Sequence, residues 1–63
     1  MVNWNEVVND VGLTTLEDFY LGNLSGKDIS KRSTAASRYI RKLGVNTFRS
    51  RCRHALYRFR AMV

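Results

Sequence analysis

The chain has 63 residues, a formal net charge of +6 and no proline, and its sequence pI is near 10.3. This length accommodates one domain with a modest core, and 44% hydrophobic residues favour a folded chain over a disordered tail. A single cysteine, Cys52, excludes an internal disulfide, and no apolar run is long enough to span a membrane. The opening residues, MVNWNEVVND, lack the features of a signal peptide, so we expect a cytoplasmic location.

Charge is distributed unevenly along the chain. Residues 1–26 contain four acids and no lysine or arginine, whereas residues 27–63 contain all 11 basic residues and one acid, Asp28. We expect a single domain, 1–63, with an acidic N-terminal part (1–26) and a basic C-terminal part (27–63). Such asymmetry favours contact with a polyanion over the alternative of a basic face that is merely solvated.

Helical spacing of apolar residues predicts an all-α fold, a small bundle of three to four helices. The first helix covers residues 3–11, with Asn3 as its N-cap and Gly12 just after its end. Its apolar stripe is Trp4, Val7, Val8 and Val11. The second helix covers residues 14–22 and ends at Gly22. Two capping boxes are available at its start, Thr14 with Glu17 or Thr15 with Asp18.

A longer helix is predicted over residues 26–43. Ser25 and Asp28 have the spacing of a capping box at its start, and Gly44 follows its end. The apolar stripe crosses the segment STAAS without a change of phase, which favours one continuous helix over two helices separated by a turn near residues 33–36. That stripe consists of Ile29, Ser33, Ala36, Ile40 and Leu43.

The last helix is predicted over residues 47–61, with Asn46 or Thr47 as its N-cap. Arginines flank its apolar stripe on both sides, while Ser50 and Tyr57 point away from it. The stripe comprises Phe48, Cys52, Ala55, Leu56 and Phe59. Taken over all four helices, the predicted core is Trp4, Val8, Leu16, Phe19, Ile29, Ile40, Leu43, Phe48, Leu56 and Phe59.

Catalytic chemistry is poorly represented in this sequence. Cys52 and His54 are two residues apart, so on a helix they point in different directions. Cys52 lies on the apolar stripe, which favours a buried structural thiol over a nucleophile. A zinc site needs more ligands than the chain supplies. We therefore expect no enzyme activity, no metal and no cofactor.

The segment LSGKDISKRSTAASRYIRKLG, residues 24–44, resembles the helix-turn-helix of bacterial transcription factors, including sigma factor region 4 and the LuxR family. The segment TFRSRCRHALYRFR, residues 47–60, is similar to the last helix of sigma region 4, the start of which reads bases. In that fold the exposed residues of the second helix enter the major groove. The resemblance implies that role for Ser37, Arg38, Arg41 and Lys42.

Charge and resemblance together predict a DNA-binding protein for transcription regulation or genome handling, of bacterial or phage type. The residues expected to contact nucleic acid are Arg38, Arg41, Lys42, Arg49, Arg51, Arg53 and Tyr57, and Tyr39 is a further candidate for stacking or hydrogen bonding. Duplex DNA is favoured as the partner. The alternatives are structured RNA bound by the arginine-rich helix, or an acidic protein partner or second subunit bound by the basic surface.

Overall fold

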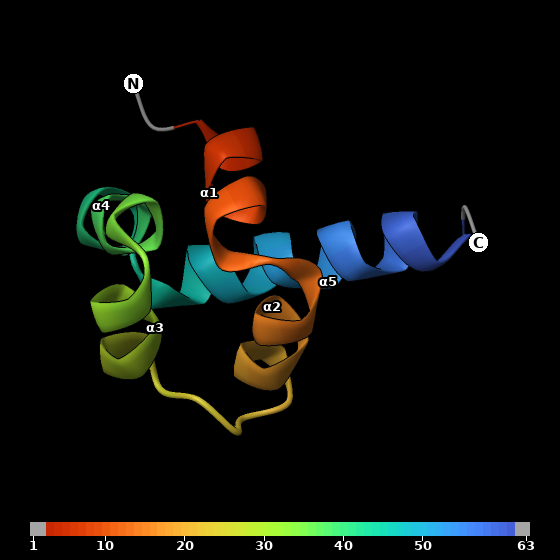
Figure 1. Cartoon of the computed structure of the whole chain (residues 1–63), viewed down its shortest axis with the longest axis horizontal. Coiled ribbons are helices and arrows are strands. Elements are labelled where there is room, and N and C mark those ends of the chain that lie inside the picture. Colours follow the sequence, from red (N-terminus) through yellow and green to blue (C-terminus); the bar gives the residue numbers. More distant parts are fainter. Residues whose placement is uncertain (1–2, 62–63) are drawn as a thin grey trace.

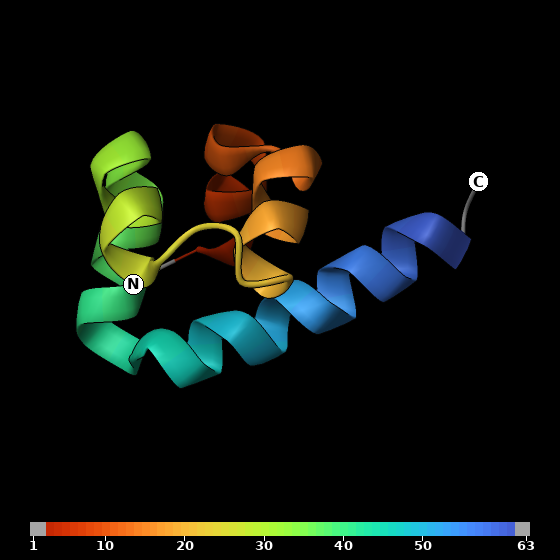
Figure 2. The ribbon, with the colours of Figure 1, turned by 90° about the horizontal axis from the view of Figure 1, so that it is seen from below.

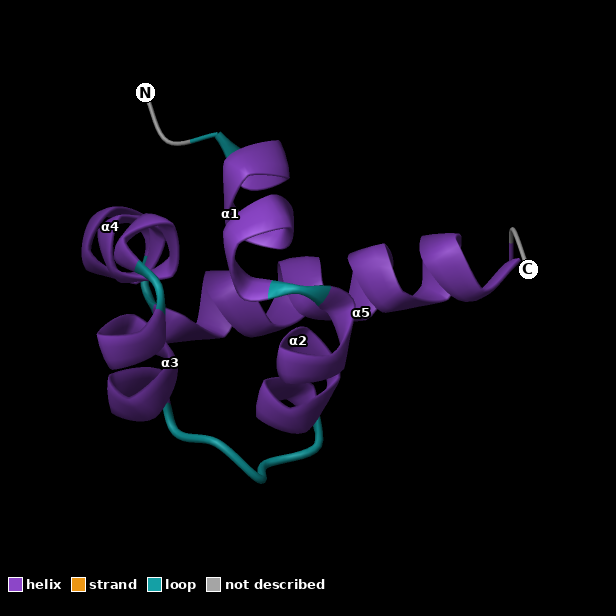
Figure 3. Cartoon of the chain, in the orientation of Figure 1, coloured by secondary structure: helices purple, strands orange, loops and turns teal. Residues whose placement is uncertain are grey.

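The computed structural model describes the backbone of residues 3–61 and the side chains of residues 3–58. Over this range the chain is all-α and contains no strand, as predicted, but it forms five helices instead of three or four (Figures 1 and 3). The helices are α1 (Trp4–Val11), α2 (Leu13–Tyr20), α3 (Gly26–Arg32), α4 (Thr34–Leu43) and α5 (Val45–Ala61).

Single residues form three of the four connections within residues 3–61: Gly12, Ser33 and Gly44. Gly12 has φ 87° and ψ 150°, and Gly44 has φ 94° and ψ 156°. This region of backbone space is essentially restricted to glycine because a Cβ atom clashes there. The two glycines therefore permit the sharp corners between α1 and α2 and between α4 and α5.

Helix α5 lies along one side of the bundle and packs mainly against α2 and α4. Figure 2 shows α1 to α4 on one side of α5, the C-terminal half of which extends beyond the bundle. Phe48 of α5 is fully buried at the centre of the core. Its ring meets three others edge to face at centroid distances of 5.5, 5.1 and 5.7 Å, those of Trp4, Phe19 and Tyr39. Each such pair contributes about 0.5–1.5 kcal/mol beyond its buried area.

The predicted continuous helix over residues 26–43 is wrong, because the chain breaks at Ser33. The Ser33 side chain caps α4: its hydroxyl oxygen accepts a 3.0 Å hydrogen bond from the Ala36 N–H. The same hydroxyl donates a 2.6 Å hydrogen bond to a carboxylate oxygen of Asp10 on α1. Ser33 is only 2% exposed, so both bonds satisfy a hydroxyl that is costly to bury without partners. A tertiary contact thus stabilises the corner between α3 and α4.

Two of the predicted caps are confirmed. The Asn3 side chain accepts a 2.9 Å hydrogen bond from the Asn5 N–H. Ser25 and Asp28 form both bonds of the capping box, with 3.0 Å from the Asp28 N–H to the Ser25 hydroxyl and 3.3 Å from the Ser25 N–H to the Asp28 carboxylate. These bonds position the first turn of α3.

The other two predicted caps are wrong, because both helices begin at a glycine corner. The Gly12 carbonyl accepts a hydrogen bond from the Leu16 N–H at 3.1 Å, so α2 begins at Leu13 and Thr14 and Thr15 lie inside it. In the same way the Gly44 carbonyl accepts from the Phe48 N–H at 3.1 Å. Helix α5 therefore begins at Val45, and Asn46 and Thr47 lie in its first turn.

Most of the predicted core is confirmed. Leu16, Phe19, Ile29, Phe48 and Leu56 are buried, and three further predicted members, Trp4, Val8 and Ile40, are half-buried against them. The side chain of Phe59 lies outside the described residues. Leu43 is a wrong prediction, since it is the last residue of α4 and is 49% exposed. Val7 and Tyr39 are core residues that the predicted set omitted.

Candidate nucleic-acid interface

Helix α5 presents one face to the bundle and the opposite face to solvent. Phe48, Cys52, Ala55 and Leu56 point into the core. We call the opposite side the open face, which consists of Asn46, Ser50, His54 and Tyr57, all exposed. Tyr57 is 79% exposed, as its sequence position predicted. All four carry hydrogen-bonding groups, and a shallow hollow runs along this face.

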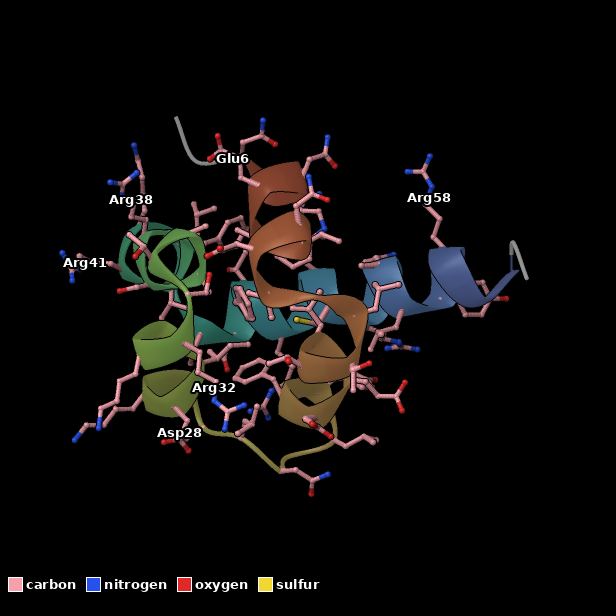
Figure 4. All side chains as sticks on the ribbon, in the orientation of Figure 1. Glu6, Asp28, Arg32, Arg38, Arg41 and Arg58 are labelled. Atoms are coloured by element: carbon pink, nitrogen blue, oxygen red, sulfur yellow. The ribbon has the colours of Figure 1, made fainter. Side chains whose placement is uncertain are left out.

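Arginines flank the open face in two rows. Arg49 and Arg53, four residues apart, form the row beside α2, and both are exposed. Arg51 and Arg58, seven residues apart, form the row beside α1, where both line a groove that Trp4 also lines. Figure 4 shows Arg58 rising from α5 in the direction of the α1 axis. The open face therefore lies between two lines of positive charge.

The Arg49 guanidinium also has a contact inside the protein. Its central carbon lies 5.2 Å from the centroid of the Phe19 ring on α2. A cation–π contact at an exposed site contributes about 0.5–1 kcal/mol. Arg49 thus helps to hold α2 on α5, a role that sequence spacing could not reveal.

The thiol of Cys52, buried beneath the row formed by Arg49 and Arg53, is expected to be unreactive. Cys52 is fully buried, and burial raises the pKa of its thiol to about 12, while the nearby charge of Arg49 acts in the opposite direction. A thiol with this pKa is protonated at neutral pH and is a poor nucleophile. This agrees with the structural role expected from the position of Cys52 on the apolar stripe.

The remaining predicted basic residues lie on α4. Arg38, Arg41 and Lys42 are all exposed, and Figure 4 shows Arg38 and Arg41 pointing away from the bundle at the end opposite to Arg58. Helix α4 meets α5 at the Gly44 corner, so its outer face and the open face of α5 are neighbouring surfaces, not one plane. The structure thus divides the predicted site residues between two helices.

Tyr39 is a wrong prediction for a nucleic-acid contact. It is 3% exposed, and its ring packs against Trp4 at 5.2 Å and against Phe48 at 5.7 Å. Ser37, which the resemblance implies as a groove residue, is half-buried. Arg58 is the residue that the predicted set omitted: it lines both the hollow of the open face and the groove beside α1. Its spacing of seven from Arg51 was the available signal.

Metal-ligand clusters and membrane-spanning helices are both absent from the described part of the chain. No group of three or more His, Cys, Asp or Glu side chains within it could hold a metal ion. None of its helices has the length and apolar character needed to cross a membrane. Comparison with known proteins found no matching family model, no matching curated protein and no matching solved structure.

Proposed function

We propose that this protein binds duplex DNA by placing α5 in the major groove. The observation that supports this proposal is the open face of α5, exposed along the helix and flanked by an arginine row on each side. The major groove is wide enough to admit an α-helix. A helix lying in it has a phosphate backbone on each flank, and two arginine rows complement that arrangement.

The polar residues between the rows would face the base edges. Asn46, Ser50 and His54 are exposed there and offer amide, hydroxyl and imidazole groups, which pair with base-edge donors and acceptors. The exposed ring of Tyr57 extends the face toward the end of α5. Binding without marked sequence preference would need only the arginines, because phosphate contacts carry no sequence information directly.

Helix α4 would add phosphate contacts beside the groove through Arg38, Arg41 and Lys42. The resemblance of residues 24–44 to a helix-turn-helix would instead place α4 in the groove, whereas the resemblance of residues 47–60 to the last helix of sigma region 4 agrees with insertion of α5. In a helix-turn-helix, however, three to four residues connect the two helices, whereas Ser33 alone connects α3 and α4. This difference and the longer exposed face of α5 favour α5 as the inserted helix. Such binding would suit a role in transcription regulation or genome handling.

The experiment is a salt titration of affinity for a short duplex. Each phosphate contact contributes about 0.9 to the slope of log K against log salt on duplex DNA. The double variant Arg51→Ala/Arg53→Ala, which removes one arginine from each row, should therefore flatten the slope by about two units. The matched control Lys27→Ala/Lys31→Ala removes the same charge from exposed positions on α3 and should change the slope less.

Three outcomes separate the possible partners. Circular dichroism first establishes that both variants fold as the wild type does. Equal slopes for the wild type and the α5 variant, or no affinity for the duplex at low salt, would refute the proposal and assign the arginines to a protein partner. Tighter binding to an RNA hairpin than to the duplex at the same salt would assign the open face to RNA.

A further inference from the structure

A groove with an apolar floor and a cationic rim separates α1 from the C-terminal half of α5. Its floor is formed by Trp4, Val8 and Ala55, and its rim carries Arg51 and Arg58 together with the polar residues Asn5 and His54. The volume is about 460 Å³, enough to admit one large side chain with its adjoining backbone. An occupant that complements this groove must present an apolar side chain beside a negative charge.

The chain itself carries such a combination at the end of α2. Leu21, at 62% exposure, is the most exposed aliphatic residue among the described side chains. Asp18 precedes it by three residues, so the two side chains lie on the same side of the helix. We call Asp18 and Leu21 the knob.

The backbone holds the knob in place. The Gly22 N–H donates a hydrogen bond to the Phe19 carbonyl at 3.1 Å, and the Asn23 N–H donates to the Asp18 carbonyl at 2.8 Å. This pair of bonds is the Schellman motif, with Gly22 at φ 87° in the left-handed position. An apolar side chain on an ordered helix end loses less conformational entropy on docking than one on a mobile loop.

We infer that the knob of one copy docks in the groove of a second copy, with Leu21 on the apolar floor and Asp18 beside the rim arginines. The two surfaces lie on opposite sides of α5. In Figure 1 the connection after α2 is at the lower edge, whereas Figure 4 shows Arg58 above α5 on the side of α1. Each copy can therefore use both surfaces at once. Such a head-to-tail contact generates a row of copies instead of a closed dimer.

Only His54 of the open face also lines the groove, so Asn46, Ser50 and Tyr57 stay exposed in this row. The knob and groove are separated along the direction in which the molecule extends about 26 Å, across the axis of α5. The extent of about 26 Å is an upper bound on the repeat, so a row along a duplex would space neighbouring copies by no more than about eight base pairs, at about 3.4 Å per pair. This cooperative step rests on the proposed DNA binding, whereas the contact between copies does not.

The contact is small, so it should be weak in solution and effective where DNA concentrates the copies. The first test uses the protein alone, with NMR spectra over a dilution series from about 1 mM, the range in which so small a contact would dissociate. Resonances of Val8, Ala55 and Leu21 should shift together with concentration. Leu21→Ser should abolish these shifts, while Leu43→Ser, which alters another exposed leucine outside both surfaces, should preserve them.

Exchanging the charges of Asp18 and Arg58 tests the same contact without changing Leu21. Asp18→Arg and Arg58→Asp should each weaken the concentration-dependent shifts, and the double variant should restore them. Absence of any shift between dilute and concentrated wild type, or equal shifts in Leu21→Ser, would overturn the inference. So would an oligothymidine that shifts Val8 and Ala55 in dilute protein, because a nucleic-acid strand would then occupy the groove.

The second test measures binding to duplexes of about 8, 16 and 24 base pairs, which are multiples of the largest expected spacing. Wild type should bind the longer duplexes cooperatively, and Leu21→Ser should lose roughly tenfold in cooperativity while keeping its affinity for the shortest duplex. Concentration-dependent shifts without affinity for any duplex would preserve the contact and refute the proposed function. Cooperativity that Leu21→Ser leaves intact would refute the contact and preserve the function.

Discussion

The Ser33 side chain should contribute more to the stability of the fold than the exposed N-cap side chains of Asn3 and Ser25. The Ser33 hydroxyl both caps α4 and donates to Asp10 of α1. Loss of an N-cap serine costs about 0.5–2 kcal/mol. Loss of the hydrogen bond to Asp10 costs about a further 0.5–1.5 kcal/mol. Ser33→Ala should therefore lower the free energy of unfolding by about 1–3.5 kcal/mol, a large share for so small a domain.

The assay is urea denaturation followed by circular dichroism, arranged as a double-mutant cycle of Ser33→Ala with Asp10→Ala. The two residues share a hydrogen bond, so the coupling energy should be about 0.5–1.5 kcal/mol. Ser25→Ala is the matched control, because Ser25 caps α3 through local bonds alone. It should be additive with Asp10→Ala. Coupling near zero between Ser33 and Asp10 would refute the role assigned to this tertiary bond.

Further predictions concern the glycine corner and two titrating groups. Gly44→Ala forces a Cβ atom onto a glycine-only conformation and should cost about 1–3 kcal/mol by urea denaturation. The pKa of Cys52 is about 12 in the fold against an ordinary value of 9.0, so the free energy of unfolding should fall as pH rises from 9.0 toward 12. For the same reason iodoacetamide should modify Cys52 in the native protein at pH 8 far more slowly than in the unfolded chain. Hydrogen bonds from the Ser25 backbone and hydroxyl lower the pKa of the Asp28 carboxyl. The stabilisation of the fold by this carboxylate is therefore present above pH 3.8 and is lost as pH falls below that value. Asp28→Asn should make the free energy of unfolding less dependent on pH in the acidic range than it is in the wild type.

Sequence periodicity predicted the helical class and several helix ends, because these depend on residues close together in the chain. Asn3, Ser25 and Gly12 act locally, and their roles as caps and corner follow from their residue types. The break at Ser33 could not be predicted in this way. It depends on Asp10, which is 23 residues earlier in the chain and becomes a partner only after α1 packs against α4.

The limits of helical periodicity also explain why burial was predicted incorrectly for an aromatic and an aliphatic residue of α4. Tyr39 and Ile40 are neighbours on either side of a stripe centred on Ala36, and spacing alone does not tell which one enters the core. The structure buries Tyr39 against Trp4 and Phe48. Leu43 occupies a stripe position, but α4 ends there. Exposed arginines were easier to predict, since a charged side chain is rarely buried without a partner.

The acidic half of the chain would repel a polyanion, and its placement removes this objection to the proposed function. Glu6 and Asp10 lie on α1 and Glu17 and Asp18 on α2, and both helices are on the bundle side of α5. The arginine rows flank the opposite side. A molecule with charge separated in this way would experience a torque in the field of a polyanion, which would turn the basic helices α3, α4 and α5 toward it and α1 and α2 away. The asymmetry between the two halves of the sequence would thus become an orientation of the molecule in space.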